Sequence, residues 1–226
     1  MSKLVLVRHG QSQWNLENRF TGWVDVPLSK KGIDEAISAG KKLKNFDFDV
    51  MYVSHMLRAI QTLNYIIVES NSKKTAIFKH ENQRVGKWES NYTGIPEKEI
   101  PVFQSVDLAE RYYGDLQGLN KQKTREKYGE DQVHLWRRSY DVNPPNGESL
   151  KNTCERTIPY YQKYIENDLN KGKTVLVSAH GNSLRSIVMH IEKISEKEIP
   201  SLEIPTGVPI IYDFDEKMNL KNKEQL

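Results

Sequence analysis

The amino-acid sequence predicts a single α/β domain over residues 1–226, a three-layer sandwich with a mostly parallel sheet and helices on both faces. In the first third of the chain, short β-branched apolar segments alternate with helical patterns, which is typical of a parallel sheet. The length of 226 residues suits one large domain with a full core. Two similar strand-and-turn segments, near the two ends of the chain, fit neighbouring strands.

The elements follow in a simple order. A strand is expected over 3–7, and Ser29 is expected to cap the first helix. Apolar residues at helical spacing mark the buried face of that helix: Ile33, Ala36, Ile37, Gly40 and Leu43. The remaining predicted elements are strands at 50–53, 75–79, 174–177 and 210–214, and helices at 55–69, 148–169 and 183–194, with two short helices before a turn at 143–147. Pro159 is expected to bend the long helix, because proline cannot donate the helical hydrogen bond.

Two segments fall outside this pattern. Residues 81–106 are polar, contain Pro96 and Pro101, and lack a sustained period, so we expect a surface excursion with one helical turn. Residues 215–226 are polar and are expected to form a mobile tail.

Composition excludes several classes of protein. The net charge of +3 is spread over the chain rather than gathered in a basic stripe, which argues against a nucleic-acid partner. No apolar segment reaches membrane-spanning length, and a strand pattern begins directly after Met1, so we expect neither a membrane partner nor a signal peptide. The single cysteine, Cys154, is expected to pack in the interior and suits a reducing compartment. The sequence therefore predicts a cytoplasmic protein.

Two histidines occupy matching positions at the ends of predicted strands. His9 follows one apolar segment and His180 the other, and each precedes a glycine, a polar residue and a serine. Ligands bind at the carboxyl ends of strands in open α/β sheets, so both imidazoles are expected in one pocket. Either histidine alone is more often a hydrogen-bonded structural residue, but the duplication and the adjacent Arg8 favour a shared site. Neither HExxH spacing nor a cysteine partner indicates a metal site, so no metal is expected.

Arginines at predicted turns and helix ends indicate an anionic ligand. Arg8, Arg58, Arg137 and Arg138 have the side chain suited to bidentate binding of phosphate or carboxylate. An adjacent arginine pair is by itself more often a solvated helix face. The glycine-rich motifs of triphosphate and dinucleotide sites do not occur in the sequence. We therefore expect a small, doubly anionic substrate.

The chemistry that fits these residues is phosphoryl transfer. A neutral His9 is expected to attack phosphorus, while His180, when protonated, binds the same phosphoryl oxygens. Glu110 is the candidate proton donor for the leaving oxygen, with a pKa raised by burial and by the phosphate charge. A surface ion pair between Glu110 and Arg111 is the alternative for that carboxylate.

Several motifs along the chain resemble those of the cofactor-dependent phosphoglycerate mutases of the histidine phosphatase superfamily. An Arg-His-Gly after the first strand marks only the superfamily, whereas the other segments are more specific. The segments that carry the resemblance are LVRHGQSQWN at 6–15, RFTGW at 19–23, ERYYG at 110–114, LQGLNK at 116–121, WRRSY at 136–140, SAHGNSLR at 178–185 and IPTGVP at 204–209. Together they extend over almost the whole chain.

The resemblance implies roles for particular residues. It implies that His9 becomes phosphohistidine, that Glu110 is general acid and base, and that Arg8, Arg58 and His180 hold the phosphoryl group. Two further sets are implied to bind substrate: Ser12, Asn15, Thr21, Gly22, Gly181 and Asn182 at the phosphate, and Tyr113, Lys121, Arg137 and Arg138 at the carboxylate and second phosphate. Arg111 is a further candidate for substrate binding.

The activity that the resemblance implies is interconversion of 3-phosphoglycerate and 2-phosphoglycerate in glycolysis and gluconeogenesis. The implied cofactor is 2,3-bisphosphoglycerate, which primes the phosphoenzyme, with no metal. The implied partners are small phosphoglycerates, with a homodimer or homo-oligomer left open. A phosphatase of the same fold is the nearest alternative, since water could take the phosphate from His9. The small Gly22 beside the pocket favours a mutase over a bisphosphoglycerate synthase, and a non-catalytic phospho-ligand binder is the third alternative.

Overall fold

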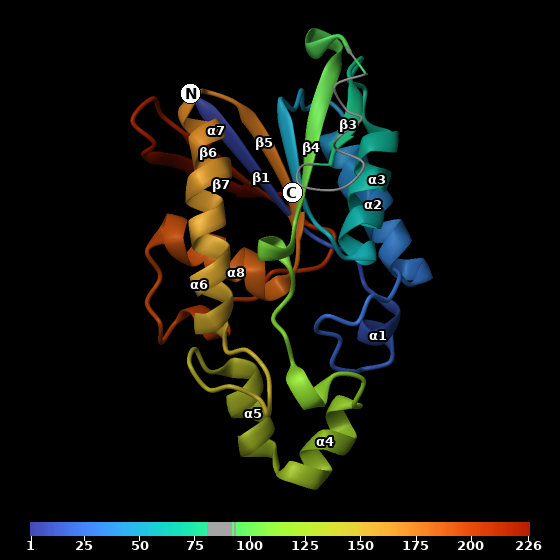
Figure 1. Ribbon diagram of the computed structural model, residues 1–226, viewed down its shortest axis with the longest axis vertical. Helices are drawn as coiled ribbons and strands as arrows, with labels where there is room; N and C mark the ends of the chain where they lie inside the picture. Colours follow the sequence, from blue (N-terminus) through green and yellow to red (C-terminus); the bar gives the residue numbers. More distant parts are fainter. Residues whose placement is uncertain (81–91, 93) are drawn as a thin grey trace.

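The computed structural model describes residues 1–80, 92 and 94–226, and its centre is a seven-stranded sheet with the order β3-β4-β2-β5-β1-β6-β7 (Figure 1). The strands are β1 Ser2–Arg8, β2 Val50–Ser54, β3 Thr75–Lys79, β4 Glu99–Ser105, β5 Thr174–Ala179, β6 Pro209–Phe214 and β7 Leu220–Gln225. The five strands from β3 to β1 pair in parallel, and β6 and β7 pair antiparallel at one edge. The predicted mostly parallel sheet is confirmed.

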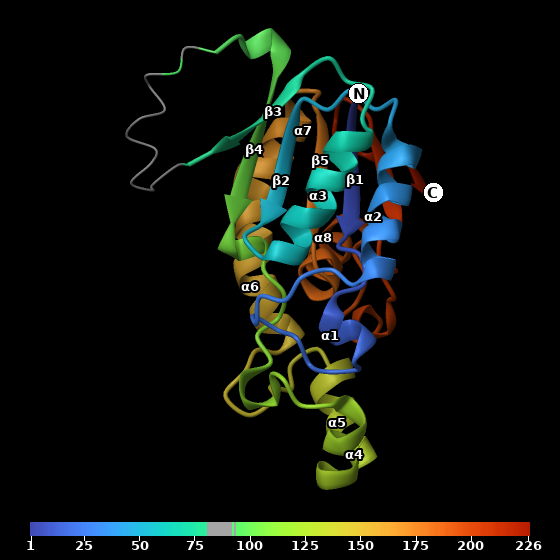
Figure 2. The same cartoon turned by 90° about the vertical axis from the view of Figure 1, so that its right-hand side faces the viewer.

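Helices cover both faces of this sheet (Figure 2). The α-helices are α1 Gln13–Leu16, α2 Lys30–Leu43, α3 Leu57–Glu69, α4 Lys121–Tyr128, α5 Glu130–Arg138, α6 Leu150–Tyr160, α7 Asn167–Asn170 and α8 Gly181–Glu192. The short 3₁₀ helices are η2 Pro96–Lys98, η3 Val106–Leu108, η4 Gly114–Leu116 and η6 Ile199–Ser201. Helices α2 and α3 pack on one face, α6 and α8 lie on the other, and α4 and α5 project beyond the carboxyl ends of the parallel strands. This is the predicted three-layer arrangement.

Strand β1 shows why the central strands are apolar at every position. Leu4 and Leu6 belong to the core under α6 and α8, whereas Val5 and Val7 belong to the core under α2 and α3. Successive side chains of a strand point to opposite faces, so a strand covered on both sides must be apolar throughout.

The prediction of a surface excursion over 81–106 is wrong for its final part. Residues 81–91 and 93 lie outside the described part of the chain, but Glu99–Ser105 form β4, an interior strand between β3 and β2. Ile100 and Val102 are buried at alternate positions. Pro101 suggested a break, yet the pairing with β2 begins only at Val102, so proline is accommodated before that ladder starts.

The prediction of a mobile tail over 215–226 is also wrong for residues 220–225. These residues form β7, which pairs antiparallel with β6 after a turn in which Asp215 accepts hydrogen bonds from the main chain of Lys217 and Asn219. All the side chains of β7 are exposed, so the strand carries no apolar pattern. The strand is held by main-chain hydrogen bonds to β6, so the hydrophobicity of the sequence does not indicate it.

The predicted bend in the long helix appears as a change of helix type. Helix α6 contains Pro159 and continues into the π-helical segment η5, Tyr161–Glu166, and then into α7. Proline removes one helical hydrogen bond and its ring crowds the preceding turn, which accounts for a local widening.

Candidate active site

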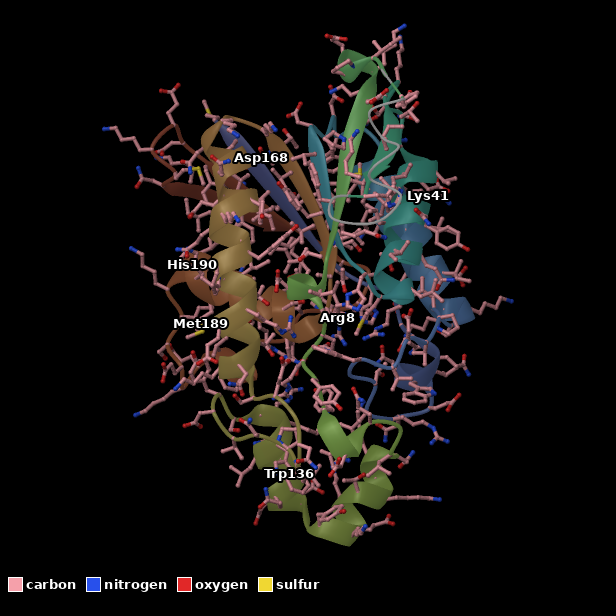
Figure 3. The ribbon with its side chains drawn as sticks, in the orientation of Figure 1. Arg8, Lys41, Trp136, Asp168, Met189 and His190 are labelled. Atoms are coloured by element: carbon pink, nitrogen blue, oxygen red, sulfur yellow. The ribbon has the colours of Figure 1, made fainter. Side chains whose placement is uncertain are left out.

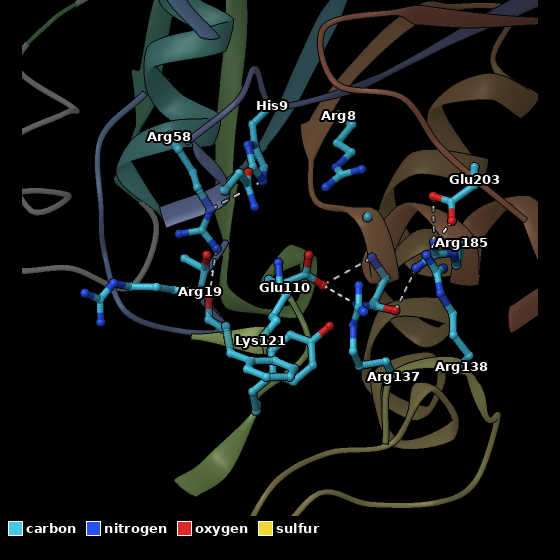
Figure 4. A pocket seen from close by; sticks show the side chains of 17 residues that line it. Arg8, His9, Arg19, Arg58, Glu110, Lys121, Arg137, Arg138, Arg185 and Glu203 are labelled. Carbon is cyan, nitrogen blue, oxygen red and sulfur yellow. Dashed lines mark hydrogen bonds and ion pairs between the residues drawn. The ribbon is translucent and has the colours of Figure 1, made fainter. Parts of the chain in front are cut away.

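A pocket opens at the carboxyl ends of β1 and β5 (Figure 4). These strands are direct neighbours, with Arg8 opposite Ala179, so the residues that follow them meet. The ring centroids of His9 and His180 are 4.9 Å apart, so the two imidazoles lie next to each other, as the matching strand ends predicted. Predicted site residues that line the pocket are Arg8, His9, Asn15, Thr21, Gly22, Arg58, Glu110, Tyr113, Lys121, Arg137, Arg138, Gly181 and Asn182.

The pocket lies between the sheet and the projecting helices. In Figure 3 the labelled Arg8 marks the end of the sheet, and the labelled Trp136 marks the α4–α5 pair below it. Trp136 is buried with Phe20, Leu116 and Val133 in a small separate core. This core holds α5 beside the loops of the pocket, so side chains from both parts of the molecule can reach one ligand.

His9 is held as a neutral imidazole with one nitrogen directed away from its own backbone. Its Nδ1 lies 2.7 Å from the carbonyl oxygen of Gly10, which can only accept, so Nδ1 carries the proton. The Nε–H of Arg58 approaches the other nitrogen, Nε2, at 3.4 Å. Burial, then Arg58 and Arg8, hold the pKa of His9 well below its usual range. Nε2 therefore carries the lone pair of the neutral ring, and in this structure that lone pair accepts the long hydrogen bond from Arg58.

The turn after His9 requires glycine. A Cβ on Gly10 would lie 2.1 Å from the carbonyl oxygen of Gly32, at the start of α2. The next residue, Gln11, donates its main-chain N–H to Glu35 on the same helix at 2.7 Å. The backbone beyond His9 is thus packed directly against α2, which fixes the direction of the imidazole.

His180 is fully buried beside His9 at the N-terminus of α8. Its Nε2 lies 2.8 Å from the Ser54 hydroxyl, and its main-chain N–H donates to the Ser183 hydroxyl at 3.2 Å. Burial, and then the charge of Arg58, lower the pKa of His180 well below its ordinary value. The free site therefore favours neutral His180, in contrast to the protonated form that the sequence suggested. A bound phosphate dianion would act in the opposite direction.

Two arginines approach the histidines from different elements. Arg58, in the first turn of α3, is completely buried and donates to the carbonyl oxygens of Gly22 at 2.8 Å and Val24 at 3.1 Å. Burial lowers its pKa to about 10, so it remains charged at neutral pH. Arg8, at the end of β1, donates to the carbonyl oxygen of Ile204 at 2.7 Å. Both guanidinium groups are fixed by the main chain before any ligand binds.

Glu110 enters the pocket from the chain that follows η3. Its Oε1 accepts three hydrogen bonds, from the Arg111 main chain at 2.8 Å, the Asn182 main chain at 3.1 Å and the Asn182 side chain at 2.8 Å. Its Oε2 points toward the side of the pocket where Arg8 lies (Figure 4). The alternative of a surface ion pair with Arg111 is wrong, since the carboxylate is buried.

The expected rise in the pKa of Glu110 is not found in the free site. Burial favours the protonated acid, but the hydrogen bonds from Arg111 and Asn182, with the charges of Arg8 and Arg58, outweigh it and lower the pKa. Glu110 is therefore ionised at neutral pH. The sequence argument considered burial and phosphate charge but could not include three donors converging on one oxygen.

A second group of cations lines the part of the pocket nearer α4 and α5. Lys121 begins α4, and its ammonium lies 5.9 Å from the centroid of the Phe20 ring. Arg137 is at the end of α5. Burial lowers the pKa of both side chains. Tyr113 lies beside them and accepts a hydrogen bond from Arg111 at 3.0 Å. This region has the donors that a carboxylate or a second phosphate requires.

Four of the lining residues were not among the predicted site residues. They are Arg19, Phe20, Arg185 and Glu203. Glu203 binds both Arg138 and Arg185, the latter at 3.6 Å, and Arg185 donates to Asn182 at 3.1 Å. Helical spacing could have indicated Arg185 as a site residue, because it lies three residues after Asn182 and shares its side of α8.

Three predicted site residues do not line the pocket. His180 is buried with its ring centroid 4.9 Å from that of His9, and Arg111 is buried with its guanidinium 4.7 Å from the Tyr113 ring centroid. Ser12 is fully buried and caps α1, where its hydroxyl accepts the Asn15 main-chain N–H at 3.2 Å. These residues support the lining rather than form it.

Unpaired polar atoms belong to residues that line this pocket or support its lining. Within residues 1–80, 92 and 94–226, the buried side-chain nitrogens and oxygens that have no hydrogen-bond partner are Arg8 Nε, Thr21 Oγ1, Arg111 Nε and Nη1, and His180 Nδ1. Every one belongs to the predicted site. Buried polar groups are normally satisfied, so such a set of donors fits an anionic ligand. Across the same residues, no group of three or more His, Cys, Asp or Glu side chains could hold a metal ion.

Comparison with known proteins places this geometry in a family. The model of the histidine phosphatase superfamily, branch 1, matches residues 4–99 and 90–222. A 2,3-bisphosphoglycerate-dependent phosphoglycerate mutase of Methanococcus vannielii is 52% identical over 96% of this chain and 92% of its own length. The protein of the same name from Protochlamydia amoebophila is 48% identical over 99% of this chain and 100% of its own length.

Solved structures agree on the fold. A mycobacterial glucosyl-3-phosphoglycerate phosphatase has a TM-score of 0.75 at 19% identity and covers 99% of this chain and 96% of its own. Bacillus stearothermophilus YhfR has a TM-score of 0.74 at 24% identity, covering 98% and 95%. None of the described helices is long and apolar enough to cross a membrane. The chain belongs to the histidine phosphatase superfamily, in the family of the 2,3-bisphosphoglycerate-dependent phosphoglycerate mutases.

Proposed function

We propose that this protein is a phosphoglycerate mutase that interconverts 3-phosphoglycerate and 2-phosphoglycerate, a step of glycolysis and gluconeogenesis, through a phosphohistidine at His9. One observation carries the proposal: a neutral nucleophilic imidazole and a carboxylate face one pocket that has cations at both ends. Relatives with about half of their residues identical over nearly the whole chain bear the name of this activity.

The first group of cations would serve the transferred phosphoryl group. His9 Nε2 attacks phosphorus, and Arg8, Arg58 and His180 stabilise the charge on the equatorial oxygens. The unpaired Arg8 Nε is a donor of the right kind for those oxygens, and so is His180 Nδ1 in the tautomer in which Nε2 accepts from the Ser54 hydroxyl. Two carbonyl groups already hold Arg58 beside His9, so only its Nε–H has to move, from His9 Nε2 to a phosphoryl oxygen, when the substrate binds.

Glu110 would serve as base and acid in turn. When phospho-His9 transfers to a substrate hydroxyl, the ionised carboxylate accepts the hydroxyl proton. For transfer back to His9, the same carboxyl group returns that proton to the leaving oxygen. The lowered pKa of Glu110 thus suits the first of these steps, in which it accepts a proton. The negative charge of the bound phosphate favours the protonated form of Glu110 that the second step needs.

The second group of cations would bind the rest of the substrate. Lys121, Arg137 and Tyr113 suit the carboxylate and the phosphate that is not being transferred. When bound, 2,3-bisphosphoglycerate would supply the phosphoryl group that primes His9. The unpaired Nε of Arg8 at one end of the pocket and the cations Lys121 and Arg137 at the other fit a ligand with two anionic ends.

The test follows conversion of 3-phosphoglycerate in the presence of a chelator, with and without catalytic 2,3-bisphosphoglycerate, while free phosphate is recorded. Conversion that depends on priming, with little phosphate released, supports a mutase without a metal. Phosphate release without isomerisation would make the protein a phosphatase, and absence of both products would make it a non-catalytic binder.

The cellular setting is part of the proposal. The composition and the single Cys154 suit a cytoplasmic enzyme of small phosphorylated acids, with neither nucleic acid nor membrane as partner. Light scattering of the purified protein would distinguish a monomer from a homodimer or larger homo-oligomer.

A further inference from the structure

Arg156, on α6, binds the chain that leads to Glu110. Its Nη1 donates to the carbonyl oxygen of Asp107 at 2.9 Å. Its Nη2 donates to the carbonyl oxygens of Ala109 at 3.1 Å and Glu110 at 2.9 Å. Arg156 does not line the pocket, so these contacts act on the main chain rather than on a ligand.

Glu148 holds both Arg156 and Tyr112, two residues beyond Glu110. Its carboxylate accepts from Arg156 Nε at 3.2 Å and Nη2 at 3.1 Å. It further accepts the main-chain N–H of Tyr112 at 3.0 Å, while its own N–H donates to the Tyr112 carbonyl oxygen at 2.7 Å. The chain is therefore held on both sides of Glu110.

Trp23 provides a third contact from a distant loop. Its indole N–H donates to the Glu110 carbonyl oxygen at 2.6 Å, so that oxygen accepts from both Trp23 and Arg156. The indole ring lies 5.1 Å from the Tyr112 ring and 5.8 Å from the Arg156 guanidinium, measured to ring centroids. The main chain at Glu110 is thus held from α6 and from the loop after α1.

We propose that Arg156, together with Glu148 and Trp23, is a positioning residue for Glu110. This inference rests on the proposed acid–base role of Glu110. Three donors lock Oε1 of the carboxylate, so the position of Oε2 relative to His9 depends on where the main chain of Glu110 lies. A displacement of about 1 Å in a reacting group can cost about 10²-fold in rate.

The expected consequence is a change in kcat rather than in KM. In Arg156→Lys, one ammonium cannot reproduce the planar set of contacts to four carbonyl groups, those of Val106, Asp107, Ala109 and Glu110, and to Glu148. We expect kcat to fall about 10- to 100-fold and KM for 3-phosphoglycerate to stay within about 3-fold, because no pocket contact is removed. Trp23→Phe keeps an aromatic ring and removes the N–H, so it should lower kcat in the same direction, and it provides a second variant if Arg156→Lys does not fold.

Thr157→Val is the matched control. Thr157 is the neighbour of Arg156, is fully buried, and donates to the Asp107 carbonyl oxygen at 2.8 Å. It anchors the same chain to α6 at a point three residues before Glu110, so its loss should lower thermal stability while kcat is retained. If kcat falls as much in Thr157→Val as in Arg156→Lys, the proposal is overturned, because loss of any contact between this chain and α6 would then lower kcat.

A double-mutant cycle with Glu110→Gln separates the two hypotheses. If Arg156 acts through Glu110, Arg156→Lys lowers kcat in the wild-type background and has little further effect in Glu110→Gln. Equal factors in both backgrounds would overturn the positioning role. A wild-type rate in Glu110→Gln itself would instead refute the proposed function of Glu110, so the two failures are distinguishable.

Discussion

The isosteric change Glu110→Gln removes a proton-transfer group with little change in shape. The three donors around Oε1 select the orientation in which the amide oxygen occupies that place, since an NH₂ group cannot accept from them. The NH₂ group then replaces Oε2 toward the pocket. The variant therefore keeps the packing of the site and loses both the base and the acid.

The expected loss of rate follows from the role of the carboxylate. General acid–base catalysis contributes about 10²- to 10⁴-fold, so the barrier to transfer should rise by about 2.7–5.5 kcal/mol. Three hydrogen bonds to a charged acceptor become bonds to a neutral one, which should lower the free energy of unfolding by about 1–3 kcal/mol. Binding of 3-phosphoglycerate should change little, because the cations of the pocket remain.

The assay separates these quantities. Steady-state conversion of primed enzyme measures the overall rate, rapid quench measures transfer between phospho-His9 and substrate, and calorimetric titration measures binding. A variant that transfers at the wild-type rate would refute the acid–base assignment. A variant that fails only to bind would show that Glu110 contributes to affinity and not to proton transfer.

Three further predictions concern other parts of the site. His9→Ala should abolish phosphoenzyme formation and all transfer, and phosphate label retained on the variant would show that the nucleophile lies elsewhere. Glu203→Gln should release Arg138 and Arg185 toward the ligand and lower KM by up to about 5-fold, whereas the surface control Glu130→Gln, next to Arg125, should leave KM unchanged. Burial lowers the pKa of both His9 and His180 from an ordinary value of 6.5, so the unfolded chain binds more protons and stability, complete above that value, should fall as the pH drops below it. The slope should reach about 1.4 kcal/mol per pH unit for each histidine, and a melting temperature that stays constant from pH 7 to about 5 would contradict the buried neutral state.

Local patterns predicted most of the central sheet but missed two strands. The segment at β4 carries a proline, and its buried apolar residues are Ile100 and Val102 alone. Strand β7 is exposed along its whole length. Both strands are stabilised by pairing with neighbours, a contribution that depends on partners distant in the sequence.

The sequence by itself determined the local features of this protein: the apolar strands, the histidine–glycine turns at their ends, and the motifs that relate it to its family. Only the tertiary structure decided the strand order that joins His9 to His180, the ionised state of Glu110, and the binding of Arg156 to a main chain 46 positions away. The physical reason is that periodicity and turn chemistry act between near neighbours, whereas charge states and positioning depend on groups that meet only when the chain has folded.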